Sequence, residues 1–237
     1  MKIVGLIRAK DAGKWMAVLM EQMKVFCDEI LFLGEPSSDD TNEIAARYSP
    51  VMIERPPGHE VGHGGHDKVL LHNCARDYSP DWIYAPDADE LLEPGAPELI
   101  RDTIKHADSF EKTMVVSPFL YIWDDFYHYR TDGRYGTITV VRLFKYFPDM
   151  HPMDRSAHSM AVPPDLLKGG KFFNSTIRLL HFGYMTINQR QEKHDFYSHR
   201  DPPGSDGYRQ GGGGGDYNDM LGANAVTDEV PNPLVIL

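Results

Sequence analysis

The chain has 237 residues, with 24 basic and 35 acidic side chains and a formal net charge of −11. This length fits one α/β domain that needs no disulfides to fold, and the negative charge excludes a general nucleic-acid binder. Cys27 and Cys74 form no disulfide framework, no apolar run approaches the ~18 residues of a membrane span, and none resembles a signal peptide. We therefore expect a cytoplasmic, globular protein without a membrane span.

Strand and helix patterns alternate over the first hundred residues. Short apolar runs predict buried strands, and apolar residues at helical spacing predict the helices between them. The expected strands cover 3–7, 30–33, 51–53 and 82–85, and the expected helices lie near 15–26, 39–48 and 67–78. This alternation predicts a Rossmann-type α/β fold with a mostly parallel sheet, in which ligands bind beyond the carboxyl ends of the strands.

The second half of the chain has a different pattern. Two strand-like stretches, 113–122 and 137–147, flank an aromatic segment rich in Asp, Tyr and Arg. Proline and glycine dominate 200–219, which is typical of a flexible linker, and no period marks the last eighteen residues. We expect one domain over 1–200 and a flexible Gly/Pro-rich tail over 201–237.

An acidic cluster, Asp87-Ala88-Asp89-Glu90, directly follows the expected strand 82–85. Three carboxylates within four residues repel one another unless a cation lies among them. Oxygen ligands suit a hard ion such as Mg²⁺ or Mn²⁺, which keeps positions open for substrate phosphates. The alternative is a solvated acidic turn ahead of the helix near Pro97. The position at the end of a strand favours the metal site.

Four segments, in this order, resemble the family 2 glycosyltransferases with the GT-A fold. They are the strand and acidic loop 28–41, the DW-apolar-DADE-apolar stretch Asp81–Leu91, the RLF-type strand Val141–Lys145, and His181-Phe182-Gly183-Tyr184-Met185 with Lys193 beyond it. The resemblance covers about residues 1–197. It implies a GT-A-like sheet with helices on both faces, a nucleotide-sugar donor (UDP- or GDP-linked) and Mn²⁺ or Mg²⁺ as cofactor.

The resemblance also implies roles for residues of the acidic cluster and beyond. Asp89 would ligate the metal directly, and Asp87 would hold the donor ribose or a metal-bound water. His181 matches the histidine that many GT-A enzymes bring back to the metal. A packed core histidine is the alternative for His181.

Three further residues match donor-binding positions of that family. Glu35 stands where an aspartate usually contacts the nucleoside, and Gly34 replaces a second aspartate. Arg8 ends the first strand, where the loop meets the base or the diphosphate. Lys68 is a further candidate phosphate contact, with a helix-surface lysine as its alternative.

The catalytic base is where this sequence departs from the family pattern. An inverting transfer needs a carboxylate to accept the proton of the acceptor hydroxyl. The usual ED or HE pair is missing, because His158 is followed by Ser159, and Ala9-Lys10 replaces the usual NE. The remaining candidates are Asp154, which we favour, and Asp125 or its neighbour Asp124.

The expected acceptor is a glycan or a lipid-linked saccharide, against the aromatic segment 119–129. Three rival functions remain open at this stage. His59-Glu60-Val61-Gly62-His63 matches the HExxH pattern of zinc metallopeptidases, although Gly62, Gly64 and Gly65 disfavour the helix that this motif requires. A nucleotidyltransferase would need a glycine-rich phosphate loop, which is missing here. A non-catalytic GT-A-like nucleotide-binding protein would fit the missing base.

Overall fold

The computed structural model describes residues 1–48, 50–59, 64–150, 161–200, 220–222, 225–231 and 233. The strands are β1 (Ile3–Ala9), β2 (Glu29–Gly34), β3 (Val51–Met52), β4 (Trp82–Tyr84), β5 (Glu90–Leu92), β6 (Met114–Tyr121), β7 (His128–Arg130), β8 (Thr139–Lys145), β9 (Phe172–Asn174), β10 (Leu179–His181) and β11 (Thr227–Glu229). The α-helices are α1 (Gly13–Phe26), α2 (Thr41–Arg47), α3 (Gly64–Ala75), α4 (Ile100–Ser109), α5 (Pro164–Gly169) and α6 (Ile187–Arg200). Short 3-10 helices are η1 (Arg76–Tyr78), η2 (Pro97–Leu99) and η3 (Gly133–Gly136).

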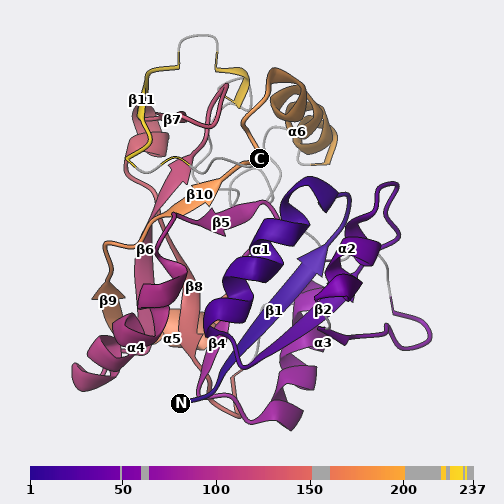
Figure 1. Ribbon diagram of the computed structural model, residues 1–237, viewed down its shortest axis with the longest axis vertical. Coiled ribbons are helices and arrows are strands. Elements are labelled where there is room, and N and C mark those ends of the chain that lie inside the picture. Colours follow the sequence, from indigo (N-terminus) through magenta and orange to yellow (C-terminus); the bar gives the residue numbers. More distant parts are fainter. Residues whose placement is uncertain are drawn as a thin grey trace.

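Nine of these strands form one central sheet in the order β3-β2-β1-β4-β8-β6-β10-β5, with β9 beside β6 (Figure 1). Strands β3, β2, β1 and β4 run parallel to one another, as the alternating first half of the chain predicts. The sheet is nevertheless mixed, because β8 runs antiparallel to both β4 and β6, and β5 runs antiparallel to β10. Strand β6 is also parallel to β9 and to β10, so parallel pairs still predominate and the expectation of a mostly parallel sheet is confirmed.

Helices cover both faces of the sheet, as expected. Helices α1, α2 and α4 pack on one face, where Trp15, Leu19 and Ile104 belong to the larger core. Helices α3 and α5 pack on the other face, around Leu71 and Phe144. Burial of these apolar side chains is the dominant stabilising contribution to a domain of this size.

A short antiparallel pair, β5 with β10, brings two distant parts of the sequence together. Glu90 lies opposite His181 in this pair, and Phe182 N donates a hydrogen bond to Asp89 O (2.9 Å). The side chain of Gln22 on α1 bonds both backbone groups of Leu92, which fixes β5 to the helix layer. The register of β5 and β10 therefore places the acidic cluster beside the segment that follows His181.

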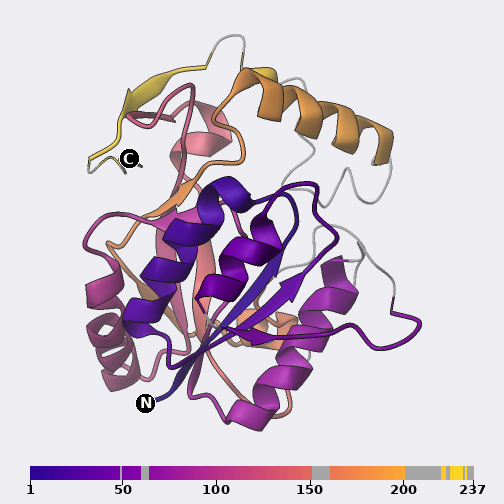
Figure 2. The ribbon, with the colours of Figure 1, turned by 45° about the vertical axis from the view of Figure 1, so that its right-hand side comes forward.

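Helix α6 and the β7–β11 pair lie beyond the end toward which β1 points (Figures 1 and 2). Strand β11 falls in the residues expected to form a tail, and it pairs antiparallel with β7 from Thr227 to Glu229. A three-residue strand carries no readable period, which is why the sequence does not predict it. Within the described residues, no helix is both long enough and apolar enough to span a bilayer.

Candidate functional site

The acidic cluster lies in the turn between β4 and β5, at the carboxyl end of β4. Glu90 has a fully buried side chain, and its Oε2 accepts a hydrogen bond from Asp87 N (2.9 Å). The turn therefore closes on itself, and the next strand starts immediately at Glu90. This arrangement leaves Asp87 and Asp89 as the two carboxylates available for chemistry.

Arg142 of β8 holds this turn in place. Its guanidinium forms a bidentate ion pair with Glu90, in which Nε lies 2.5 Å from Oε2. The Nη2 atom also donates a hydrogen bond to Asp87 Oδ2 (2.8 Å). Burial would lower the pKa of Arg142, but Glu90 and Asp87 raise it, so the guanidinium stays charged. Burial raises the pKa of Glu90, and Arg142 opposes that shift. Arg142 thus compensates a carboxylate that would be costly to bury alone.

Asp89 is the meeting point of two further side chains. His181 Nε2 lies 3.3 Å from Asp89 Oδ2, and Lys193 Nζ of α6 lies 3.3 Å from the same oxygen. Burial alone would raise the pKa of Asp89, but the charges of Lys193 and His181 hold it far below its ordinary value. Asp89 is therefore ionised across the physiological pH range.

Gly183 provides the space in which these three side chains meet. A Cβ atom at this position would clash with Asp89 Oδ2, Lys193 Nζ and His181 Nε2. Only glycine leaves this volume empty, so the backbone after β10 forms one wall of a small polar cradle. Sequence reasoning includes Gly183 in a motif but assigns it no role.

Aromatic rings surround His181 on its other sides. Phe119 stacks on the imidazole at a centroid distance of 5.0 Å, while Tyr121 and Tyr184 meet it edge-on at 5.0 Å and 5.3 Å. Among the described residues His181 Nδ1 has no hydrogen-bond partner. The ring is thus fixed by packing, with Nε2 directed at Asp89. His181 is therefore packed like a core histidine on one side and contacts an acid on the other.

Three residues are predicted to hold the metal, directly or through a bound water. Asp89 and His181 contact each other, whereas Asp87 contacts Arg142 and, more distantly, Lys68 (3.9 Å). No group of three His, Cys, Asp or Glu side chains that could hold an ion occurs in the part of the chain that the structure describes. A catalytic Mn²⁺ or Mg²⁺ needs only one or two protein ligands, because phosphate and water oxygens complete its shell. The oxygen and nitrogen of Asp89 and His181 fit such an ion.

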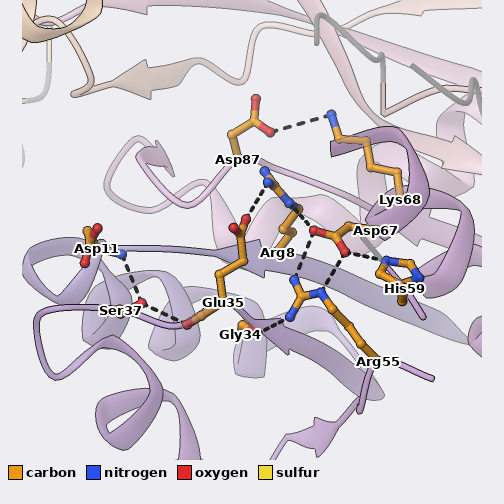
Figure 3. A network of polar contacts seen from close by, with 10 residues as sticks. All are labelled: Arg8, Asp11, Gly34, Glu35, Ser37, Arg55, His59, Asp67, Lys68 and Asp87. Carbon is orange, nitrogen blue, oxygen red and sulfur yellow. Dashed lines mark hydrogen bonds and ion pairs between the residues drawn. The ribbon is translucent and has the colours of Figure 1, made fainter. Parts of the chain in front are cut away.

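A second polar network lies at the ends of β1 and β2 (Figure 3). Arg8 bridges two acids, since it forms an ion pair with Glu35 and donates from Nε to Asp67 Oδ2 (2.6 Å). Asp67 of α3 is completely buried and also accepts from Arg55 Nε (2.9 Å) and His59 Nε2 (2.8 Å). Arg8 and Glu35, two residues that the resemblance assigns to the donor, are therefore paired with each other in this network.

The loops after β1 and β2 are tied to each other beside this network. Asp11 Oδ1 accepts from Ser38 N (2.6 Å), Asp11 N donates to Ser37 Oγ (3.2 Å), and Asp39 Oδ2 accepts from Gly13 N (2.8 Å). Asp11 adopts a positive φ of 47°, which an aspartate tolerates better than most residues. These bonds fix the two loops that border Arg8 and Glu35.

A pocket opens between α3 and the ends of β1 and β4, and both charged and apolar side chains line it. It is lined by Leu6, Arg8, Lys68, Leu71, His72, Ala85, Pro86, Asp87 and Ala161. Burial lowers the pKa of Lys68 and brings that of His72 to about 4, so His72 is neutral at pH 7. Among the described residues, His72 Nδ1 has no hydrogen-bond partner. The pocket thus joins Arg8, Lys68 and Asp87, three predicted donor-binding residues.

The candidate catalytic bases are Asp154, Asp125 and Asp124. Asp154 and His158 lie outside the described residues. Asp125 precedes β7, and its Oδ1 accepts from Tyr127 N (2.7 Å) and from His128 N (3.0 Å). Desolvation tends to raise the pKa of Asp125, yet these hydrogen bonds hold it below its ordinary value. Asp124 pairs with Arg190 at 2.8 Å.

Most of the HExxH segment cannot be compared with the structure. Glu60–His63 lie outside the described residues, and α3 is described from Gly64 onward. His59 precedes that helix and binds Asp67 through Nε2.

Replacing Asp67 by asparagine tests the second network. We expect a loss of about 2–3 kcal/mol in the free energy of unfolding, less than for a fully buried pair because Arg8 stays partly exposed. Desolvation would raise the pKa of Asp67, but Arg55, Arg8 and His59 lower it below its ordinary value. The stabilisation that Asp67 contributes is therefore complete above the pKa of an unfolded aspartate, which is near 4. It declines as the pH falls through the lower pKa of Asp67 in the folded state. Urea unfolding at pH 7 and below pH 4 measures both effects.

The exposed Asp77→Asn variant is the control, and its free energy should stay within about 0.5 kcal/mol of the parent. Equal stability of the Asp67→Asn variant and this control at pH 7 would contradict the role given to Asp67.

The sequence and the fold were also compared with those of known proteins. No family model matches the chain. Uncharacterized proteins of Mycobacterium tuberculosis and Mycobacterium bovis are each 26% identical over 211 residues, which is 85% of this chain and 51% of theirs. The chain thus spans about half the length of the curated relatives it matches.

The crystal structure of TarS from S. aureus superimposes with a TM-score of 0.50 at 11% identity, over 84% of this chain and 40% of TarS. Residues 1–349 of TarS in complex with UDP superimpose with a TM-score of 0.52 at 11% identity, over 93% of this chain and 70% of that one. A weaker likeness is found to glucosyl-3-phosphoglycerate synthase from Mycobacterium tuberculosis in complex with Mn²⁺, UDP-glucose and phosphoglyceric acid. It covers 56% of this chain and 45% of that one, with a TM-score of 0.39 and 19% identity. The chain has the GT-A glycosyltransferase fold.

Proposed function

We propose that this protein transfers a sugar from a nucleotide-sugar donor, with UDP or GDP as the nucleotide, to a glycan or lipid-linked saccharide. The observation that carries the proposal is the convergence of Asp89, His181 and Lys193 at the carboxyl end of the sheet, in a GT-A fold. In open α/β sheets this end is where ligands bind.

Asp89 and His181 would hold Mn²⁺ or Mg²⁺ in this proposal. The ion, when bound, supplies positive charge against the diphosphate that departs from the sugar. Asp87 is held by Arg142 at the rim of the pocket, where it can accept hydrogen bonds from the donor ribose. Arg142 thereby fixes Asp87 and Glu90 without contacting the donor.

The pocket between α3 and the ends of β1 and β4 would take the nucleoside. Its apolar wall, Leu6 and Leu71, suits a planar base, and Lys68 and Arg8 bring positive charge to the side facing the phosphates. Glu35 holds Arg8 in place through their ion pair. In this assignment Arg8 and Lys68 keep the donor-binding roles that the resemblance implies, whereas Glu35, which does not line the pocket, positions Arg8.

A carboxylate must accept the proton of the acceptor hydroxyl if the transfer inverts configuration. The hydrogen bonds to Asp125 stabilise its ionised form, which makes that carboxylate a weaker base. We therefore keep Asp154 as the proposed base, with Asp125 as the second candidate.

Release of UDP or GDP from a panel of nucleotide sugars in the presence of Mn²⁺, with water as acceptor, tests the proposed activity. We expect release from one nucleotide class, lowered about 10²–10⁴-fold by Asp154→Asn and much less by Asp125→Asn. Tight binding of a nucleotide without any release would instead identify a non-catalytic nucleotide-binding protein. Zinc-dependent peptide cleavage that is lost in His59→Ala would overturn the proposal in favour of a metallopeptidase.

A further inference from the structure

We propose that Lys193 is an exchangeable counter-cation: it pairs with Asp89 as long as no divalent ion is bound, and moves to the donor diphosphate when such an ion binds Asp89. This inference rests on the proposed function and assigns a donor-binding role to a residue of α6. It predicts that ion and nucleotide bind cooperatively, and that Lys193 carries the coupling.

The contact between Lys193 and Asp89 is loose compared with the fixed ion pairs of the same region. Charge-assisted N–O contacts usually measure about 2.7–2.9 Å. Arg142 to Asp87 falls in this range at 2.8 Å, whereas Lys193 Nζ stays 3.3 Å from Asp89 Oδ2. The Lys193 side chain also keeps 30% of its exposure, so water and ligands can reach it. Lys193 is therefore paired with Asp89 without being locked to it.

Lys193 has a second partner, the Tyr184 ring, which can stabilise the ammonium charge when the lysine leaves Asp89. Its Nζ lies 4.5 Å from the centroid of the Tyr184 ring, within the range of a cation–π contact. Gly183 lets the lysine approach both groups, because a Cβ there would occupy the space of Nζ. Lys193 can thus leave Asp89 while its ammonium group keeps a favourable contact with the Tyr184 ring.

Charge balance explains why the exchange depends on the nucleotide. A lysine and a divalent ion repel each other strongly if both contact Asp89 Oδ2. An ion arriving alone must therefore displace Lys193 from its carboxylate. A diphosphate adds negative charge beside the ion, and the lysine then gains a new partner when it leaves Asp89. Linkage requires that each ligand then strengthens the other by the same factor.

The test is Mn²⁺ binding to this protein, measured by the EPR signal of the free ion, for the parent and for Lys193→Met. Without nucleotide, we expect Lys193→Met to bind Mn²⁺ about tenfold more tightly, which corresponds to about 1.4 kcal/mol. With saturating Mn²⁺, calorimetric titration should show about tenfold weaker binding of UDP or GDP to the same variant. The coupling between the two ligands is thereby lost.

Two further variants control for general effects. Lys193→Arg keeps the charge and should retain most of the coupling, while Lys105→Met removes an exposed lysine of α4 and should change neither affinity. Unchanged Mn²⁺ affinity in Lys193→Met, together with normal nucleotide binding by the parent, would overturn the inference and leave the proposed function intact. Failure of the parent to bind UDP or GDP with any metal would overturn the proposed function itself.

Discussion

Replacing Arg142 by methionine will lower the free energy of unfolding by about 3–5 kcal/mol, the cost of leaving one partner of a buried ion pair without the other. Glu90 is almost completely buried, and Arg142 is the cation that contacts it. Methionine fills much of the volume but supplies no charge and no donor. Urea unfolding of parent and variant at pH 7 measures the loss.

The double variant Arg142→Met/Glu90→Met separates lost charge balance from lost packing. Because an apolar pair can replace a buried ion pair at little cost, we expect the double variant to regain most of the lost stability. The single variant should also suffer less at pH 5 than at pH 8. In that variant Glu90 has a folded pKa above its unfolded value, so the penalty is absent at low pH and grows as the pH rises. A double variant no more stable than the single one would contradict this account.

Replacing Asp89 by asparagine will reduce Mn²⁺-dependent nucleotide binding at least about 100-fold, because loss of even an outer partner of a metal site commonly costs 10–100-fold. The fold should survive, since the Asp89 side chain is partly exposed and its hydrogen-bonded backbone oxygen is unchanged. Calorimetric titration with UDP and with GDP, with and without Mn²⁺, measures the effect.

Asp28→Asn is the matched control, because Asp28 is a partly exposed, ion-paired aspartate at the opposite, amino-terminal end of the strands. Metal-dependent nucleotide binding by Asp89→Asn equal to that of this control would contradict the role of Asp89.

Much of the fold follows from the sequence where elements are long enough to show a period. Helix α1 and strands β1, β2, β4, β6 and β8 lie where apolar patterns predict them. The three-residue strands β5, β7, β9 and β11 escape prediction, because their pairing is decided by distant partners and not by local periodicity. The mixed character of the sheet depends on those partners too.

In the candidate site, too, some residues can be predicted from local sequence and others depend on tertiary contacts. The acidic cluster and its place after a strand can be read directly, and family resemblance adds His181. The sequence gives no signal for Asp67, which looks like an ordinary acidic residue near a helix start but lies buried among Arg8, Arg55 and His59. Their positions 59, 12 and 8 residues away along the chain make that network a product of tertiary folding.

The central claim is that Asp89 and His181 hold a divalent ion against the phosphates of a nucleotide. Pulsed EPR of Mn²⁺ bound to this protein with UDP or with GDP tests it most directly. We expect ³¹P coupling from the nucleotide together with ¹⁴N modulation from an imidazole, and loss of the ¹⁴N modulation in His181→Gln. Bound Mn²⁺ that shows neither signal, or a ¹⁴N modulation that persists in His181→Gln, would contradict it.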